Sequence, residues 1–175
     1  MRKVLYLFSK FSDQDVDWLI GTGRRQEVKP GDVLIHEGRH TDSLFITLAG
    51  NYEVVKNEKV IATIGAGEVL GELSFLDSRP PVATNIATET GTVLSIASSR
   101  LNSKLRADTG FASRFYLALG IMLADRMRQT TSQLAYGRTL DESTEELDEI
   151  PADLLDSASV AAARFGRLRE AVLTR

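Results

Sequence analysis

Apolar and polar residues alternate in the middle of the chain, and this pattern predicts short β-strands between Val33 and Ile96. Six runs rich in β-branched and aromatic residues carry the pattern: VLIH, SLFITLAG, YEVVK, VIATI, ATNIAT and TVLSIA. Turn-forming residues such as Pro30-Gly31-Asp32 and Glu89-Thr90-Gly91 separate the runs. Many short strands at this spacing are typical of a β-sandwich or a jelly-roll barrel.

On either side of the strands the apolar spacing changes to that of helices. Ser12 can cap a short helix that ends at Gly21. After the last strand, Ser98 or Ser99 can cap another short helix that runs to about Arg106. The chain is therefore expected to fold as strands flanked by helices, an α+β arrangement that is mainly β.

A long helix follows, for which Asp108 supplies a cap. Its apolar residues recur every four positions and end near Leu134, a stripe formed by Phe111, Phe115, Leu119, Leu123 and Met127. A stripe of this length is too apolar for a solvated single helix, so we expect another helix to cover part of it.

The last segment, Ser157–Arg175, is predicted to form an amphipathic helix. Its apolar stripe consists of Ala161, Phe165, Leu168 and Val172, surrounded by Arg164, Arg167, Arg169 and Arg175. This helix can pack back on the strand region, dock a partner protein or, as a weaker alternative, lie on a membrane surface.

Composition and charge divide the chain into unequal parts. The 175 residues, 43% of them hydrophobic, suffice for one full core with an appendage. Residues up to Leu140 include 17 basic and 15 acidic side chains, whereas those from Asp141 onward include 4 basic and 9 acidic ones. We therefore expect a domain at 1–137, an acidic linker at 138–156 and a helix at 157–175. The absence of cysteine and of a long apolar run favours a cytoplasmic protein without a membrane span.

The stretch GELSFLDSRPPVAT, Gly71–Thr84, is the most specific motif of the chain. Together with PGDVLIHEG and SLFITLAGNYEVV before it and the long helix after it, this stretch resembles the cyclic nucleotide-binding domain family. The likeness runs from about Leu7 to about Leu134. It implies a β-roll or jelly-roll barrel with a short N-terminal helix and a long C-terminal helix. It also implies that the stretch is the phosphate-binding cassette.

The resemblance assigns the first part of the cassette to the sugar and the phosphate. Backbone N–H groups of Leu73 and Ser74, at the start of a short helix, would bind the anionic phosphate. Gly71 would let the backbone approach the ligand closely, because glycine lacks a Cβ atom. Glu72 repels the phosphate and would instead accept a hydrogen bond from the ribose 2′-hydroxyl.

The remaining contacts are assigned in the same way. The Ala83 N–H and the Thr84 hydroxyl would close the other side of the phosphate. The base would meet the long helix, where the hydroxyl of Thr130 or Thr131 can bond a purine edge. The implied ligand is cyclic AMP or cyclic GMP, and no other cofactor is indicated.

The cassette departs from the family pattern at Pro81, which stands where the family has an arginine that pairs with the phosphate. Proline has neither a charge nor an N–H group, so binding is expected to be roughly 10- to 100-fold weaker. Arg79 is a candidate replacement, although Pro80-Pro81 stiffens the loop between them. Two hypotheses follow: a cyclic-nucleotide sensor that signals through protein contacts, or a degenerate relative that serves as an assembly or adaptor module.

Other chemistry is not supported by the sequence. No nucleophile, base and orienting group occur together, so an enzyme is not expected. HEGRH, His36–His40, matches a zinc-protease pattern, but the preceding strand and the internal Gly38 favour a chance match and no metal. The acidic DESTEELDE segment and the absence of a basic recognition helix argue against nucleic-acid binding.

The resemblance also implies how copies of the chain assemble. In the family the long helix pairs with its twin, which predicts a parallel homodimer with Leu119, Met122 and Leu123 near the seam. The alternative is that the tail helix covers the same stripe within one chain.

Overall fold

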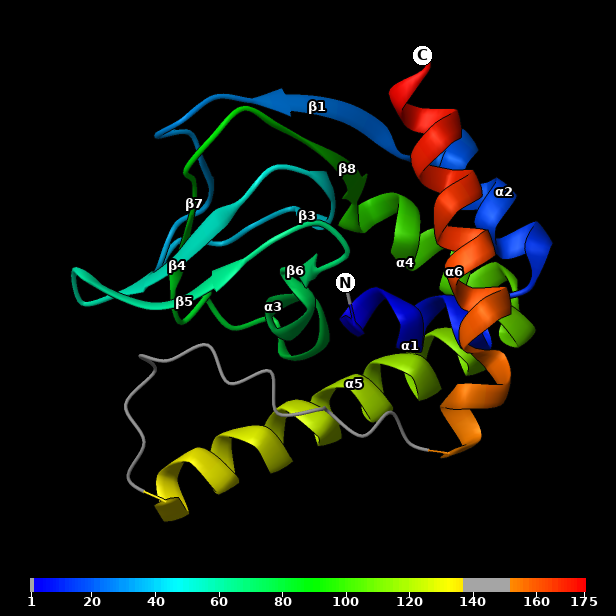
Figure 1. Ribbon diagram of the computed structural model, residues 1–175. Helices are drawn as coiled ribbons and strands as arrows, with labels where there is room; N and C mark the ends of the chain where they lie inside the picture. Colours follow the sequence, from blue (N-terminus) through cyan, green and yellow to red (C-terminus); the bar gives the residue numbers. More distant parts are fainter. Residues whose placement is uncertain (1, 137–151) are drawn as a thin grey trace.

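The computed structural model describes residues 2–136 and 152–175, with the helices gathered on one side of two sheets (Figure 1). The helices are α1 (Arg2–Lys10), α2 (Asp13–Thr22), α3 (Glu72–Asp77), α4 (Ser98–Ala107), α5 (Thr109–Tyr136) and α6 (Ala152–Leu173). The strands are β1 (Arg24–Val28), β2 (Val33–Ile35), β3 (Ser43–Ala49), β4 (Tyr52–Lys56), β5 (Lys59–Ile64), β6 (Val69–Leu70), β7 (Thr84–Ala87) and β8 (Gly91–Ala97).

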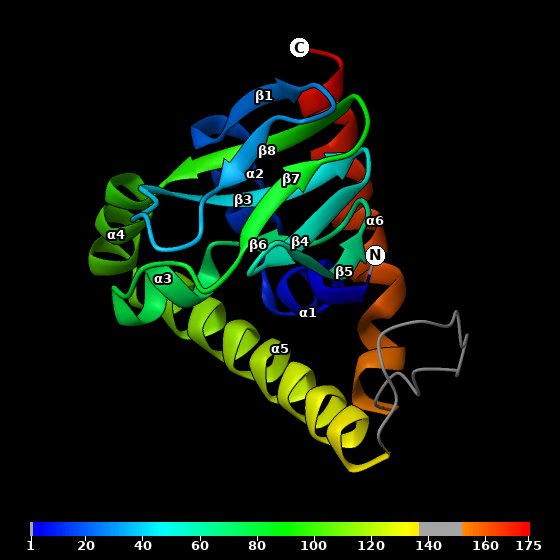
Figure 2. The same ribbon diagram turned by 90° about the vertical axis from the view of Figure 1, so that its left-hand side faces the viewer.

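Within the described residues the strands form two antiparallel four-stranded sheets. The first sheet has the order β1-β8-β3-β6, and the second has the order β2-β7-β4-β5. Because consecutive strands often change sheets, the fold is jelly-roll-like, which confirms the predicted class (Figure 2). The two sheets remain separate and do not close into a barrel.

All six predicted strands are present, and two further strands were not predicted. β1 has the sequence RRQEV, of which only Val28 is buried, so it carries no apolar alternation. It is a strand because it pairs in register with β8 along the edge of the first sheet. β6 has two residues and is defined by its pairing with β3. Both strands depend on partners that a local pattern does not reveal.

The first sheet is buried on both faces, which explains the almost continuous apolar run of β3. Leu44, Ile46 and Leu48 of β3 belong to the core shared with the helices. Phe45 of the same strand faces the second sheet, in a smaller core that lies between the two sheets. This inter-sheet core consists of Val28, Ile35, Phe45, Tyr52, Leu70, Ala87 and Val93.

Helix α1 is a feature that the sequence pattern did not predict. Its residues from Val4 to Phe8 are all buried, because α1 packs against both α5 and α6. Figure 1 shows α1 enclosed between these two helices. The five apolar residues are consecutive, and the polar residues around them, such as Lys3, Ser9 and Lys10, are half-buried. The short VLYLF run alone therefore does not distinguish a helix from a strand.

The predicted caps are confirmed at two helices and are absent at a third. Ser12 and Asp15 form a complete capping box at the start of α2, which ends at Thr22, one residue beyond Gly21. The Asp108 carboxylate accepts a hydrogen bond from the Phe111 N–H at 2.8 Å, at the start of α5. Helix α4 begins at Ser98 itself, without a side-chain cap, so neither serine has the predicted role there.

The apolar stripe of α5 is buried in its first half and exposed in its last member. Phe111, Phe115 and Leu119 are almost completely buried, whereas Met127 is 72% exposed. Leu119 and Met122, two residues of the predicted dimer seam, are each 1% exposed within the single chain. The prediction of that seam was wrong for these two residues, because they lie in the core of the chain's own fold, where α5 packs against α1.

Helix α6 begins at Ala152, five residues before the predicted Ser157. The last five residues of the predicted linker, 152–156, therefore belong to α6. Residues 137–151 lie outside the described part of the chain. The predicted stripe of α6 is buried against α1 and α2: Ala161, Phe165, Leu168 and Val172. The helix thus packs on the N-terminal helices of its own chain.

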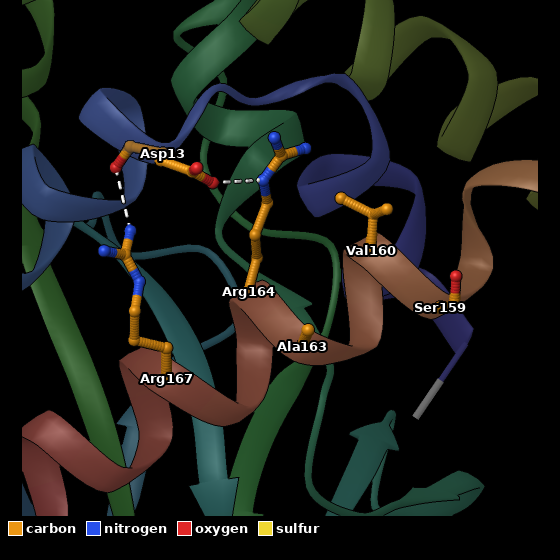
Figure 3. Close-up of a pocket in the computed structure, with 6 residues that line it drawn as sticks. All are labelled: Asp13, Ser159, Val160, Ala163, Arg164 and Arg167. Carbon is orange, nitrogen blue, oxygen red and sulfur yellow. Dashed lines mark hydrogen bonds and ion pairs between the residues drawn. The ribbon is translucent and has the colours of Figure 1, made fainter.

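Arginine side chains fasten α6 along α2. Arg164 donates to the Asp13 carboxylate at 2.8 Å, and Arg167 donates to the Asp13 carbonyl at 2.9 Å (Figure 3). Near the end of the helix, Arg175 donates to the Ile20 carbonyl at 2.7 Å. These arginine contacts therefore fix the position of α6 along α2, while the apolar stripe of α6 supplies the buried contact area.

We expect Phe165→Ala to destabilise the protein by about 3 kcal/mol, because the Phe165 ring is 7% exposed and its centroid lies 5.7 Å from that of Phe8. The matched control is Val160→Ala on the exposed side of α6, with an expected change within about 0.5 kcal/mol. Urea denaturation measures both free energies of unfolding. Equal values for the two variants would contradict the packing of α6.

Candidate ligand-binding site

Gly71 forces the turn that starts the candidate site. It is the N-cap of α3 and has φ = 86°, in the left-handed region that favours glycine. A Cβ atom at this position would also lie 2.9 Å from the Ser43 carbonyl oxygen. Glycine is therefore required here by the close approach of β3 to the start of α3, and the predicted approach to a ligand stays a prediction.

Glu72 is buried and paired with a side chain from α5. Its side chain is 5% exposed, and its carboxylate accepts a hydrogen bond and ion pair from Arg126. A buried carboxylate is stable only with such a partner. Arg126 was not predicted as a site residue. The only available signal was that a buried Glu72 requires a cation, and the sequence does not show that Glu72 is buried.

Leu73 and Ser74 occupy the first turn of α3. Their N–H groups have no acceptor within the helix, since the first helical bond runs from the Phe75 N–H to the Gly71 carbonyl at 3.0 Å. The Leu73 side chain is 40% exposed, and Ser74 is half-buried. The two N–H groups thus lie at the start of a short helix, next to the buried Glu72, and their predicted contact with a phosphate stays a prediction.

Arg79 does not turn toward the other predicted residues. Its side chain is 84% exposed, and its Nε lies 3.6 Å from the Asp77 carboxylate. The Arg79 N–H also donates to Asp77, at 3.0 Å. Arg79 therefore belongs to an exposed local turn, as the stiff Pro80-Pro81 pair would favour.

The second half of the loop is fastened to the segment after β2. The Glu37 N–H donates to the Thr84 hydroxyl at 3.0 Å, and the Gly38 N–H donates to the Pro81 carbonyl at 2.9 Å. Ala83, between these two contacts, is 8% exposed. The Thr84 hydroxyl predicted to face a phosphate is thus already an acceptor within the chain.

Lys56 also links the loop to the segment after β2, and it was not predicted as a site residue. Its ammonium group donates to the Glu37 carboxylate at 2.7 Å and to the Val82 carbonyl at 2.6 Å. The hydrogen bond from Lys56 is the main reason why the pKa of Glu37 lies below its ordinary value, and the smaller effect of burial opposes it. Glu37 of the HEGRH segment therefore holds the loop in place.

A metal site is not found in this part of the molecule. His36–His40 forms a turn after β2, and no group of metal-ligating side chains occurs within residues 2–136 and 152–175.

None of the helices in the same ranges combines the length and apolarity needed to cross a bilayer.

The two predicted base contacts lie beyond Arg126 on α5. Thr130 follows Arg126 by one turn, and its hydroxyl donates to the Arg126 carbonyl at 2.9 Å. Thr131 follows Met127 by one turn, and its hydroxyl donates to the Met127 carbonyl at 2.8 Å. Both residues are exposed. Thr130 therefore shares the face of α5 that meets Glu72, whereas Thr131 lies on the exposed apolar face.

A separate pocket of about 370 Å³ lies between α2 and α6, lined by Asp13, Ser159, Val160, Ala163, Arg164 and Arg167 (Figure 3). Its two arginines are already bonded to Asp13, and Arg167 also lies 2.9 Å from the Asp17 carboxylate. The hydrogen bond from Arg164 lowers the pKa of Asp13. With its charges paired in this way, the pocket serves the docking of α6 and is a poorer candidate.

The segment that contains the candidate site matches a known protein family. The family model of the cyclic nucleotide-binding domain matches residues 25–108, which include the whole 71–84 segment. A cGMP-dependent protein kinase of Plasmodium berghei is 31% identical over 86 residues, covering 49% of this chain and 10% of the kinase. The Pycsar effector protein XpPycTIR of Xanthomonas perforans is 27% identical over 116 residues, covering 66% of this chain and 38% of the effector. The chain thus spans well under half of either relative.

A solved structure shares the fold over most of the chain. It is a cyclic nucleotide-binding domain from Methylobacillus flagellatus KT, with a TM-score of 0.69 and 24% identity. The match covers 81% of this chain and 85% of that one. It supports the arrangement of the sheets and helices described above.

We expect Arg126→Met to destabilise the protein by about 2–3 kcal/mol, because it leaves the Glu72 carboxylate buried without its cation. The double variant Glu72→Gln/Arg126→Met is expected to be more stable than Arg126→Met alone, since the unpaired charge is then removed. Arg128→Met, at an exposed position of the same helix, is the control. Urea denaturation gives all three values, and an Arg126→Met effect within about 0.5 kcal/mol would refute a buried pair.

Proposed function

Because residues 25–108 match the family model of the cyclic nucleotide-binding domain, we propose that this chain is a regulatory module that binds a 3′,5′-cyclic nucleotide at residues 71–84. The observation that carries the proposal is the contact between Glu72 and Arg126. It joins the start of the candidate site to α5, the helix that carries the candidate base contacts. A ligand at this place would touch both parts at once.

The ligand would be held mainly by neutral hydrogen-bond donors. The N–H groups of Leu73, Ser74 and Ala83 would bind the phosphate oxygens, and Thr130 would bond the base. Arg126, which is bonded to Glu72, would lie close to the ribose. A carboxylate offers about four acceptor sites, so Glu72 can accept from a ligand hydroxyl while it keeps Arg126.

The output of the module would be a change in the position of α5. A ribose hydroxyl on Glu72 and a base on Thr130 would both stabilise one placement of this helix relative to α3. We propose that other proteins read this placement, and that the chain itself is not an enzyme. Cyclic AMP and cyclic GMP are the first candidate ligands.

A second candidate function is favoured by the loop between α3 and β7. Pro81 supplies no charge to a phosphate, and Arg79 points to Asp77 at the surface. A chain with these features can retain the fold as an assembly or adaptor module without a nucleotide. The two candidate functions differ in one measurable property, the affinity for a cyclic nucleotide.

Isothermal titration calorimetry with the four common 3′,5′-cyclic ribonucleotides, bearing adenine, guanine, cytosine or uracil, tests the first function. We expect at least one of them to bind the full chain. Glu72→Ala should weaken this binding, and Pro81→Arg should strengthen it by about tenfold or more, because it restores a charge-assisted contact.

Arg79→Ala is the matched control, and its affinity should equal that of the wild type because this side chain faces solvent. If neither the wild type nor Pro81→Arg binds any of the four nucleotides at millimolar concentration, the module is not a nucleotide sensor. The adaptor function would then be retained.

We further propose a parallel homodimer through the exposed face of α5. Exposed positions on this face alternate in steps of three and four residues: Leu117, Gly120, Ala124, Met127 and Thr131. Leu117 and Met127 are 54% and 72% exposed, and the small residues between them allow two helices to approach closely. This face replaces the predicted seam, whose residues Leu119 and Met122 are buried within the chain.

Light scattering of the full chain at high micromolar concentration tests the dimer. The wild type is expected to have twice the mass of one chain, and Leu117→Lys/Met127→Lys is expected to be monomeric because it places four like charges in the seam. Val160→Lys, on the exposed side of α6, should leave the mass unchanged. A monomeric wild type would exclude this interface.

A further inference from the structure

The loop between α3 and β7 has two successive backbone carbonyls that are held by other parts of the chain. The Pro81 carbonyl accepts a hydrogen bond from the Gly38 N–H at 2.9 Å. The Val82 carbonyl accepts one from the Lys56 ammonium at 2.6 Å, across 26 positions of the sequence. The peptide groups to which these two carbonyls belong therefore have a fixed orientation.

Lys56 reaches the loop from a rigid place, the last position of β4. It is followed by a two-residue turn in which both residues have positive φ, and it pairs with Lys59 at the start of β5. In the register of β4 with β7, Val55 lies opposite Thr84. The next antiparallel step places Lys56 opposite Ala83. The ammonium group thus extends to the loop from the neighbouring strand.

The charge of Lys56 acts on the loop through the Val82 carbonyl. The ammonium group is also paired with the Glu37 carboxylate at 2.7 Å, so Lys56 is not a free cation for a ligand. An ammonium group has three N–H donors, and Glu37 and Val82 take two of them. A hydrogen bond from a charged donor is shorter and stronger than one between neutral groups, and the short bond to Val82 is of this kind.

The N–H group of Ala83 belongs to the same peptide group as the Val82 carbonyl. This peptide is trans, so its C=O and N–H point in opposite directions, and the Ala83 N–H points away from Lys56. Ala83 is 8% exposed, and its N–H takes part in none of the loop hydrogen bonds found within residues 2–136 and 152–175. Buried N–H groups are normally paired, so this one is available to an acceptor from outside the chain.

We propose that Lys56 is a positioning residue for the phosphate of the bound nucleotide. By holding the Val82 carbonyl, Lys56 fixes the direction of the Ala83 N–H before the ligand arrives, which removes an ordering cost from binding. The cation also polarises the peptide group, so that its N–H becomes a stronger donor to an anion. Lys56 thus acts in place of the cation that Pro81 does not supply, without touching the phosphate itself. This inference rests on the proposed nucleotide binding.

Isothermal titration calorimetry of the full chain with the best-binding cyclic ribonucleotide is the first test. Lys56→Met removes the ammonium group and keeps the apolar stem, and it should weaken binding by about tenfold. Lys56→Arg keeps a cation that can bond the same carbonyl, so its affinity should stay within about threefold of the wild type. Lys59→Met, which replaces an exposed lysine at the other end of the same turn, is the matched control and should bind as the wild type does.

The second test separates the positioning of one N–H group from a general effect on the loop. The Rp and Sp phosphorothioate analogues of the nucleotide each carry sulfur, a weaker acceptor, in place of a different exocyclic phosphate oxygen. In the analogue whose sulfur faces the Ala83 N–H, this contact is already weakened, so Lys56→Met should cost less than about threefold. With the other analogue the loss should again be about tenfold, as it is for the parent nucleotide.

Lys56→Gln, which also lacks the charge, should show the same pattern, and it is measured so that a folding defect of Lys56→Met does not decide the outcome. Two results would overturn the role of Lys56 while leaving nucleotide binding intact. One is an affinity of both variants that equals that of the wild type. The other is an equal loss for the parent nucleotide and both phosphorothioates, which would mean that Lys56 only stabilises the loop. A wild type that binds none of the four cyclic ribonucleotides would instead refute the proposed function, and this inference with it.

Discussion

The burial of α1 between α5, α6 and the first sheet is the contact on which the remaining structure depends. Phe8 of α1 is completely buried and packs on the rings of Phe11 and Phe165. The Val4 N–H donates to the Gly67 carbonyl at 3.0 Å, which ties the same helix to the turn between β5 and β6. Since α1 contacts both long helices, it fixes their positions relative to the sheets.

Two ion pairs then set the position of α5 along its length. Near its start, Arg114 makes two hydrogen bonds to the buried Asp15 of α2, at 2.7 and 2.9 Å. Burial raises the pKa of Asp15, but the hydrogen bonds from Arg114 and Ser12 outweigh it, so the pKa lies below its ordinary value. Farther along, Arg126 pairs with Glu72. The helix is thus held at α2 by a pair within the core and at α3 by a pair within the candidate site.

The second of these pairs has a consequence for ligand recognition. Charges around residues 71–84 are matched within the chain: Glu72 with Arg126, Glu37 with Lys56 and Arg79 with Asp77. A cyclic nucleotide would therefore depend on backbone N–H groups and neutral side chains, each of which contributes less than a charged contact.

Patterns of local origin allowed much of the fold to be predicted from the amino-acid sequence. The alternation in runs such as SLFITLAG, the Ser12 capping box and the Asp108 cap act within a few residues, so each is readable without the tertiary structure. The Gly71–Thr84 segment was found in the same way, because its glycine turn and short helix are also local.

Other elements could be identified only in the tertiary structure, because residues far away in the sequence surround them. Five consecutive residues of helix α1 are buried because α5 and α6 pack against it, and β1 is a strand only through its pairing with β8. Arg126 lies 54 positions from Glu72, so their pairing depends on where α5 runs. For the same reason, the sequence identified Glu72 and Pro81 as important positions, but whether each charge near them is paired or exposed was determined by packing.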